Sequence, residues 1–188
     1  APVTLIHNPS QRVNHWPTAR QVTMAQLATW PRIPPLQLSF SGPTDLPAMA
    51  RAAIACGAAN PGGSILVLDE LDLALRALSD AKWTYQGVEV PIMDMFTMYG
   101  WHAKATLLAT ARRPAKLGRD VPDLAEGIFG GRISGDDDLR WIAATCGSTV
   151  ATAAASMPQR EFILYRLYGA PLRVYVDANG NIAFDGAQ

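Results

Sequence analysis

Short apolar runs alternate with longer segments of mixed polarity along this chain. The runs with the length of β-strands cover residues 3–7, 36–40, 64–68, 105–110, 127–134 and 161–167. Segments long enough for helices lie between several of them, at 45–56, 71–99 and 136–146. This alternation is typical of βαβ units, in which helices connect parallel strands. We therefore expect an α/β fold with a mostly parallel central sheet flanked by helices.

Local signals predict several boundaries. Thr44 is the expected N-cap of the helix at 45–56, with Pro47 in its first turn and Gly57 just past its end. One or two further helices are expected at 71–99, interrupted at Gly87.

Near the two ends of the chain, the sequence predicts less regular structure at residues 11–35 and a hairpin close to the C-terminus. Residues 11–35 read as irregular apart from a short helical stretch at 22–29. Near the C-terminus, two apolar runs at 172–177 and 182–185 flank the sequence Ala-Asn-Gly-Asn, which predicts a β-hairpin.

Composition narrows the class of protein. With 188 residues and 49% hydrophobic content the chain can bury one core, so we expect a single domain over residues 1–188. Sixteen basic and sixteen acidic residues cancel, so no global charge draws the protein to nucleic acid or membrane. The two cysteines and three histidines lack metal-site spacing. Neither a membrane span nor a signal peptide is recognisable, and we expect a cytoplasmic protein.

Two carboxylates follow the most apolar short run. Asp69 and Glu70 come directly after Ile-Leu-Val-Leu at 65–68, and open α/β sheets bind ligands at the carboxyl ends of their strands. In a nucleoside triphosphatase such a position holds an acid linked to Mg²⁺ and a second acid that orients the attacking water. The simpler alternative is that the two carboxylates are charged surface residues at the point where the strand leaves the sheet and enters solvent.

A second polar strand end comes about forty residues later. The run 105–110 closes on Thr110, which Arg112 and Arg113 follow. A hydroxyl or a cation at the tip of a neighbouring strand is suited to sensing a γ-phosphate, because it can contact the phosphate and the water together.

These motifs follow one another in a recognisable order. They read ILVLDELDLAL at 65–75, YGWHAKATLLATARRPAKLGRDV at 99–121, GIFGGRISGDDDLRWIA at 127–143 and QREFILYR at 159–166. The order resembles that of the FtsK/HerA superfamily of DNA-pumping P-loop ATPases, in particular its viral packaging and zonula-occludens-toxin-like members. The resemblance covers about residues 60–168 and implies a RecA-like ATPase core, with ATP and Mg²⁺ as cofactors.

The resemblance also implies roles for individual residues. Asp69 would support Mg²⁺ and Glu70 would polarise the water, as in a Walker B motif, while Thr110 and Arg112 would act as sensors. Arg132 lies where some relatives carry an arginine that acts across a subunit boundary; a surface pairing with Asp136 or Asp138 is the alternative. The chain departs from the family at Trp101, where an arginine is usual, and at Arg112, where a glutamine is usual.

One essential motif is missing from the sequence. A P-loop ATPase needs Gly-x-x-x-x-Gly-Lys-Ser/Thr, whose backbone amides surround the phosphates, and no such motif occurs in the 188 residues. We expect the first strand and phosphate loop to precede this sequence in a longer protein. A domain that lost the loop and kept the fold for assembly is the alternative.

The resemblance predicts a motor and its partners. We expect a ring-shaped homo-oligomer that couples ATP hydrolysis to movement of double-stranded DNA, with a viral capsid or a membrane-bound assembly as a further partner and a location in the host cytoplasm or virion. Basic residues at 112, 113, 116 and 119 could track a DNA backbone or form a solvated loop. The alternatives are a structural or morphogenesis protein without hydrolysis and a secretion or conjugation component.

Overall fold

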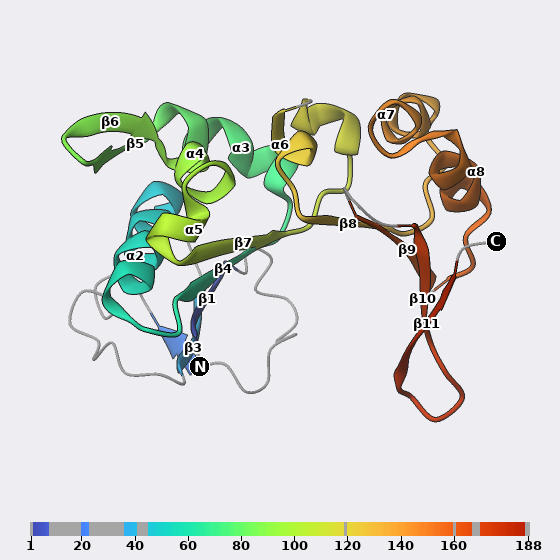
Figure 1. Cartoon of the computed structure of the whole chain (residues 1–188), viewed down its shortest axis with the longest axis horizontal. Coiled ribbons are helices and arrows are strands. Elements are labelled where there is room, and N and C mark those ends of the chain that lie inside the picture. The colour runs from blue at the N-terminus through green and yellow to red at the C-terminus, as the bar shows by residue number, and fades with distance from the viewer. Residues whose placement is uncertain are drawn as a thin grey trace. The chain divides into compact units, whose positions relative to one another are not determined.

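The chain forms two compact units, Ala1–Arg112 and Arg113–Gln188. The computed structural model describes residues 2–7, 20–22, 36–40, 45–118, 120–159, 161–166 and 170–186. Each unit has its own sheet and its own helices (Figure 1). The expectation of a single domain over 1–188 stays a prediction.

The first unit is built on a five-stranded parallel sheet. Its strands run in the order β2-β3-β1-β4-β7, and each neighbouring pair is parallel. Their bounds are β1 (Val3–His7), β2 (Arg20–Val22), β3 (Leu36–Phe40), β4 (Ser64–Leu68) and β7 (Ala105–Ala109). The predicted α/β class with a parallel central sheet is therefore confirmed.

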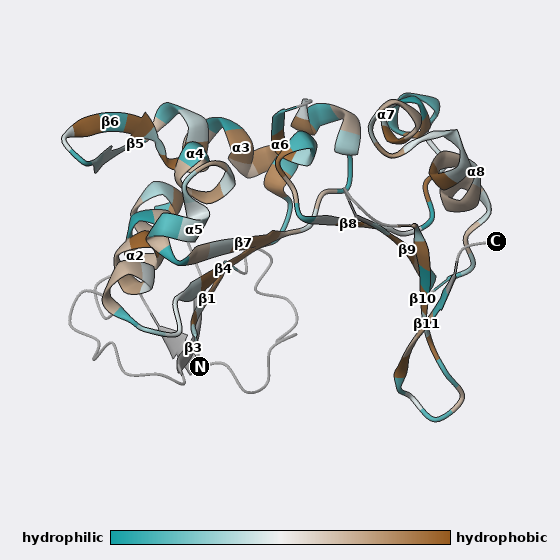
Figure 2. Ribbon diagram, in the orientation of Figure 1, coloured by the Kyte–Doolittle hydropathy of each residue, from teal (hydrophilic) through white to brown (hydrophobic). Residues whose placement is uncertain are grey.

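Helices cover the face of this sheet to which Leu5, Leu66 and Leu68 point. All three leucines are completely buried. The helices are α2 (Leu46–Ala59), α3 (Leu71–Asp80), α4 (Ile92–Thr97) and α5 (Gly100–Ala103). Residues 65–68 are all apolar because β4 is flanked by β1 and β7 and buried beneath α2. Figure 2 shows the resulting hydrophobic band along the central strands.

Helix α2 differs from the expected boundaries at both ends. The N-cap is Asp45, whose carboxylate accepts a hydrogen bond from the Ala48 amide at 3.0 Å; Thr44 lies outside the described residues. Gly57 lies within the helix, which continues to Ala59. A Cβ at residue 57 would lie 2.5 Å from the Ala103 carbonyl oxygen, so the glycine serves close approach and does not end the helix.

A β-hairpin replaces part of the helical segment expected at 71–99. Strands β5 (Lys82–Tyr85) and β6 (Val88–Pro91) pair antiparallel. Gln86 and Gly87 join them with φ of 51° and 83°, the left-handed values that tight two-residue hairpin turns require. Lys-Trp-Thr-Tyr alternates with a period of two, so the helical expectation for this stretch was wrong. The helical stretch expected at 22–29 lies outside the described residues except for Val22, which ends β2.

The second unit contains an antiparallel sheet of four strands, in the order β11-β10-β9-β8. Its strands are β8 (Gly127–Gly130), β9 (Glu161–Arg166), β10 (Leu172–Val176) and β11 (Ile182–Gly186). The predicted C-terminal hairpin is β10–β11, and β8 and β9 extend it through antiparallel pairs. Helices η1 (Pro114–Leu117), α6 (Asp120–Asp123), α7 (Asp136–Cys146) and α8 (Ser148–Ser156) complete the unit.

Candidate nucleotide-hydrolysis site

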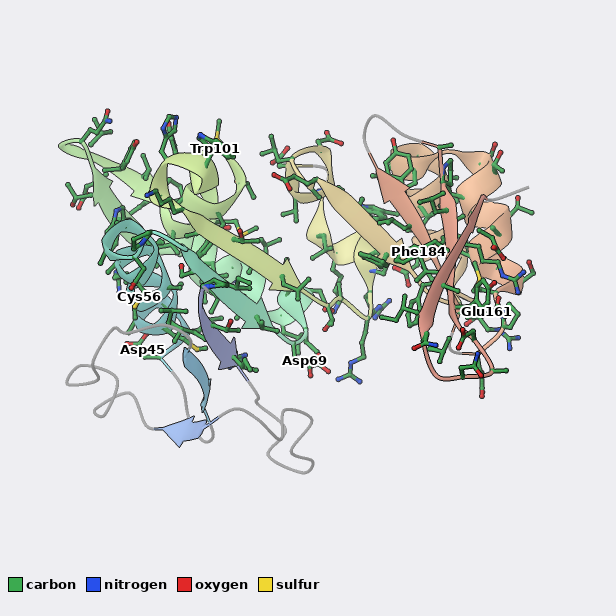
Figure 3. The ribbon with its side chains drawn as sticks, turned by 60° about the horizontal axis from the view of Figure 1, so that its bottom comes forward. Asp45, Cys56, Asp69, Trp101, Glu161 and Phe184 are labelled. Atoms are coloured by element: carbon green, nitrogen blue, oxygen red, sulfur yellow. The ribbon has the colours of Figure 1, made fainter. Side chains whose placement is uncertain are left out.

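The candidate site lies at the carboxyl ends of β4 and β7. These strands are adjacent and parallel, with Leu68 opposite Ala109. The residues that follow, Asp69 and Thr110, therefore leave the sheet side by side although they are 41 positions apart in sequence. Figure 3 labels Asp69 at this end of the strands. The structure thus brings together the two strand ends that the sequence singled out.

Hydrogen bonds join the two strand ends closely. The Thr110 hydroxyl donates to Asp69 Oδ1 at 2.6 Å and accepts from the Glu70 amide at 3.0 Å. The Thr110 amide donates to the Leu68 carbonyl at 3.0 Å, and the Thr110 carbonyl accepts from the Leu71 amide at 2.7 Å. Thr110 therefore positions the whole turn from Leu68 to Leu71, including both carboxylate residues.

Glu70 has an unusual backbone conformation. Its φ of 61° and ψ of 59° lie in the left-handed region, which costs a non-glycine residue about 1–2 kcal/mol. Glu70 also precedes α3 as its N-cap residue, yet its side chain makes no capping hydrogen bond. Strained residues of this kind are frequent at functional sites, where surrounding contacts hold them in place.

Arg112 holds the Glu70 carboxylate. Its Nη2 forms an ion pair with Glu70 Oε1, and the Glu70 side chain is 19% exposed against 76% for that of Arg112. The guanidinium thus covers one oxygen of the carboxylate from the solvent side. The sequence placed Arg112 at the strand tip as a phosphate sensor; the structure adds that its partner in this arrangement is Glu70.

His7 also belongs to this edge of the sheet. It ends β1 and pairs with Leu68 in register. Burial lowers the pKa of its imidazole, and the nearby Asp69 carboxylate opposes that shift. Its Nδ1 is buried without a hydrogen-bond partner in the described part of the chain. From the sequence, His7 was weighed only as a metal ligand, although a polar residue that ends a strand was a signal for this edge of the sheet.

The donor set at Asp69 is compatible with Mg²⁺. This ion prefers oxygen ligands and is commonly bound by one or two carboxylates, with water and substrate phosphates completing its shell. Asp69 is exposed, and only its Oδ1 is engaged among the described residues. Over the same residues no group of three or more His, Cys, Asp or Glu could hold a metal. A site here would therefore depend on phosphate oxygens as well as on Asp69.

Arg132 belongs to the second unit, whereas Asp69 belongs to the first. It follows β8, which ends at Gly130, and it is exposed. The nearby acids have other partners, because Asp138 accepts from the Ala115 amide and Asp137 pairs with Arg140. Within the described ranges Arg132 makes no ion pair, so the surface pairing considered for it is not observed. Its role as a finger stays a prediction.

The two bonds of the Thr110 hydroxyl make a testable contribution to stability. Thr110→Val keeps the shape of the side chain but leaves Asp69 Oδ1 and the Glu70 amide to water. We expect it to lower the free energy of unfolding by about 2 kcal/mol, because each of the two intramolecular hydrogen bonds usually contributes about 1 kcal/mol. Urea denaturation measures the effect. Thr110→Ser keeps the hydroxyl and is the matched control; equal losses in both variants would contradict the assignment.

Comparison with known proteins gives matches of structure but not of sequence. No protein-family model matches the chain, and no curated protein matches it. No described helix is long and apolar enough to cross a membrane.

The solved structures similar to this chain include a viral packaging enzyme. The genome packaging NTPase B204 from Sulfolobus turreted icosahedral virus 2, in complex with AMP, aligns with a TM-score of 0.67 and 14% identity over 100% of this chain and 83% of that one. The complex of the same enzyme with sulfate aligns with a TM-score of 0.66 and 14% identity, over 100% of this chain and 82% of that one. B204 of Sulfolobus turreted icosahedral virus, a DNA-packaging ATPase, aligns with a TM-score of 0.66 and 15% identity. The alignment covers 100% of this chain and 83% of that one. At this identity, the likeness shows that this chain shares the fold of those enzymes.

Proposed function

We propose that this chain is the hydrolysis part of an ATPase that packages viral DNA. The observation that carries the proposal is the cluster of Asp69, Glu70 and Thr110, joined by hydrogen bonds across adjacent parallel strands. The shared fold supports it, because the similar proteins are genome packaging NTPases whose structures were solved with AMP, AMPPCP and ATP-gammaS.

Each residue of the cluster has a role in this proposal. Asp69 would hold Mg²⁺ together with the nucleotide phosphates, and such an ion would supply positive charge beside the phosphoryl group. Glu70 accepts a hydrogen bond from the attacking water and so orients it. Thr110 keeps both acids in register, and Arg112 contacts the γ-phosphate once it leaves the Glu70 carboxylate.

The proposal requires a phosphate-binding loop from outside these residues. The motif Gly-x-x-x-x-Gly-Lys-Ser/Thr occurs nowhere in the sequence, and the described cluster contains no lysine to neutralise the phosphates. A longer form of the protein with this loop would complete the site. The missing motif also favours the second candidate, a structural protein of the same fold that does not hydrolyse ATP.

The motor function extends the proposal to partners. Double-stranded DNA is the proposed substrate of movement, in the host cytoplasm or the virion, and a ring of identical subunits would let Arg132 reach a neighbour's phosphates. A secretion or conjugation motor would use the same chemistry on a different cargo.

Hydrolysis assays on two forms of the protein test this proposal. We expect no ATP hydrolysis from the 188-residue chain and turnover from a form that begins about forty residues further upstream in the gene, raised by duplex DNA. Phosphate release with and without DNA is the measurement. If no upstream coding sequence exists and neither nucleotide binding nor hydrolysis is detected, the structural candidate replaces the ATPase.

A further inference from the structure

The antiparallel sheet of the second unit has one strongly apolar face. Residues opposite each other on neighbouring strands share a face, and side chains alternate along each strand. Phe162 pairs with Val174, and Val174 pairs with Phe184. Phe129 joins this face through Leu164, and Val176 pairs with Ile182. We call the exposed members of the set the open face: Phe129, Phe162, Val176, Ile182 and Phe184.

The other face of the sheet is the one that the unit uses for its core. Ile163 packs there in a cluster with Ile142, Cys146 and Val150 from α7 and α8. Further along, Glu161 and Arg173 form a two-bond ion pair on that face, at 2.8 Å each. The helices thus lie against one side of the sheet, and the open face is not part of that core.

The open face is large and exposed. Its members are 44% to 68% exposed, whereas Leu164 and Val174 between them are 3% and 7% exposed. Large side chains such as phenylalanine bury about 150–250 Å² each, so five of them at this exposure present roughly 500 Å². Monomeric proteins seldom show contiguous apolar patches above a few hundred Å², and larger ones mark sites of interaction. Figure 3 labels Phe184 on this sheet.

We propose that the open face is an interface with a second copy of this chain. A surface that docks on its own copy must not repel itself, and the five side chains of the open face carry no charge. The formal net charge of the chain is also zero, so two copies approach without long-range repulsion. Two such faces bury roughly 1,000 Å² in total, which reaches the size expected of a specific interface.

Packing of two sheets supplies a geometry for this contact. Sheets stack about 10 Å apart, with side chains from the facing surfaces interdigitating. The phenylalanines of three different strands would fill such a layer, with Phe162 and Phe184 flanking Val174 in its central row. The contact uses no residue of the Asp69 cluster and is independent of the ATPase proposal.

Light scattering after size exclusion tests the interface on the nucleotide-free full-length protein. We expect an oligomer that dissociates on dilution, and we expect Phe184→Glu to raise its dissociation constant at least about 100-fold, since each copy would then bury a charge. Phe184→Leu keeps an apolar side chain and is expected to retain the oligomer. Val88→Glu is the matched control, because Val88 is 62% exposed on the β5–β6 hairpin, which belongs to the first unit.

Three results would overturn the proposal. They are a wild-type protein that is monomeric at every concentration, an oligomer that survives Phe184→Glu unchanged, and equal dissociation by Val88→Glu. The dilution series of the wild-type protein needs no variant, so a monomer at every concentration overturns the proposal even if Phe184→Glu does not fold. If the wild-type protein is an oligomer, its dissociation by Phe184→Glu but not by Val88→Glu assigns the contact to the open face. A monomer whose Phe184→Glu variant unfolds more easily would show that the open face is covered within one chain.

Discussion

Glu70→Gln is expected to leave nucleotide binding intact and to lower ATP turnover by about 100- to 10,000-fold, the usual contribution of a general base. The amide has nearly the shape of the carboxylate but cannot orient and polarise water as an anion does. Glu70 takes part in no capping bond of α3, so the change to glutamine removes no hydrogen bond from the helix. Single-turnover hydrolysis and binding of a fluorescent nucleotide, in a form that contains the phosphate-binding loop, separate the two effects.

Glu89→Gln provides the control for this variant. Glu89 is an exposed carboxylate of β6 in the same unit, so its replacement changes the net charge equally without touching the cluster. Its turnover should match that of the wild-type protein. If Glu70→Gln hydrolyses ATP at the wild-type rate, Glu70 has no part in the mechanism.

The largest expected effect on stability comes from Leu66→Ala. Leu66 is completely buried in the middle of β4, between Leu5 of β1 and Leu107 of β7. Truncation removes apolar contacts and leaves a cavity that the close-packed sheet and α2 cannot fill. We expect the free energy of unfolding to fall by about 2–5 kcal/mol, measured by urea denaturation.

Leu108→Ala is the matched control for that truncation. Leu108 lies on the adjacent strand β7 but is 54% exposed, so the same change should cost within about 1 kcal/mol. Similar losses in the two variants would show that β4 is not the centre of the core. The comparison thus tests whether β4, the strand that Asp69 follows, is buried at the centre of the sheet.

Apolar runs along the chain were sufficient to predict the central strands and the class of fold. Strands 3–7, 36–40 and 64–68 agree with the structure residue by residue. The reason is local: a strand buried on both faces needs consecutive apolar residues, and polar or turn-forming residues must follow where it leaves the sheet. The same rule identified the ends of β4 and β7 as a candidate site. The catalytic roles assigned there remain predictions.

Local patterns were insufficient where a residue's role depends on distant neighbours. Gly57 looks like the end of a helix, but the backbone of Ala103 and Lys104 packs against it. The strands at 127–130 and 161–166 pair antiparallel with each other, in a different sheet from the parallel one. The partner of a strand can lie far away in the sequence, and the pattern of residues within one strand does not determine which strand it pairs with.

The candidate site likewise has features that the sequence predicted and features that depend on the tertiary structure. Sequence alone determined that Asp69, Glu70, Thr110 and Arg112 lie at or just after strand ends, because the length of an apolar run and the polar residues that follow it can be read from neighbouring positions. Only the tertiary structure decided that Thr110 bonds to Asp69, that Arg112 pairs with Glu70 and that His7 lies beside them. The first two contacts join residues 41 and 42 positions apart, and all three exist because β1, β4 and β7 pair in one register.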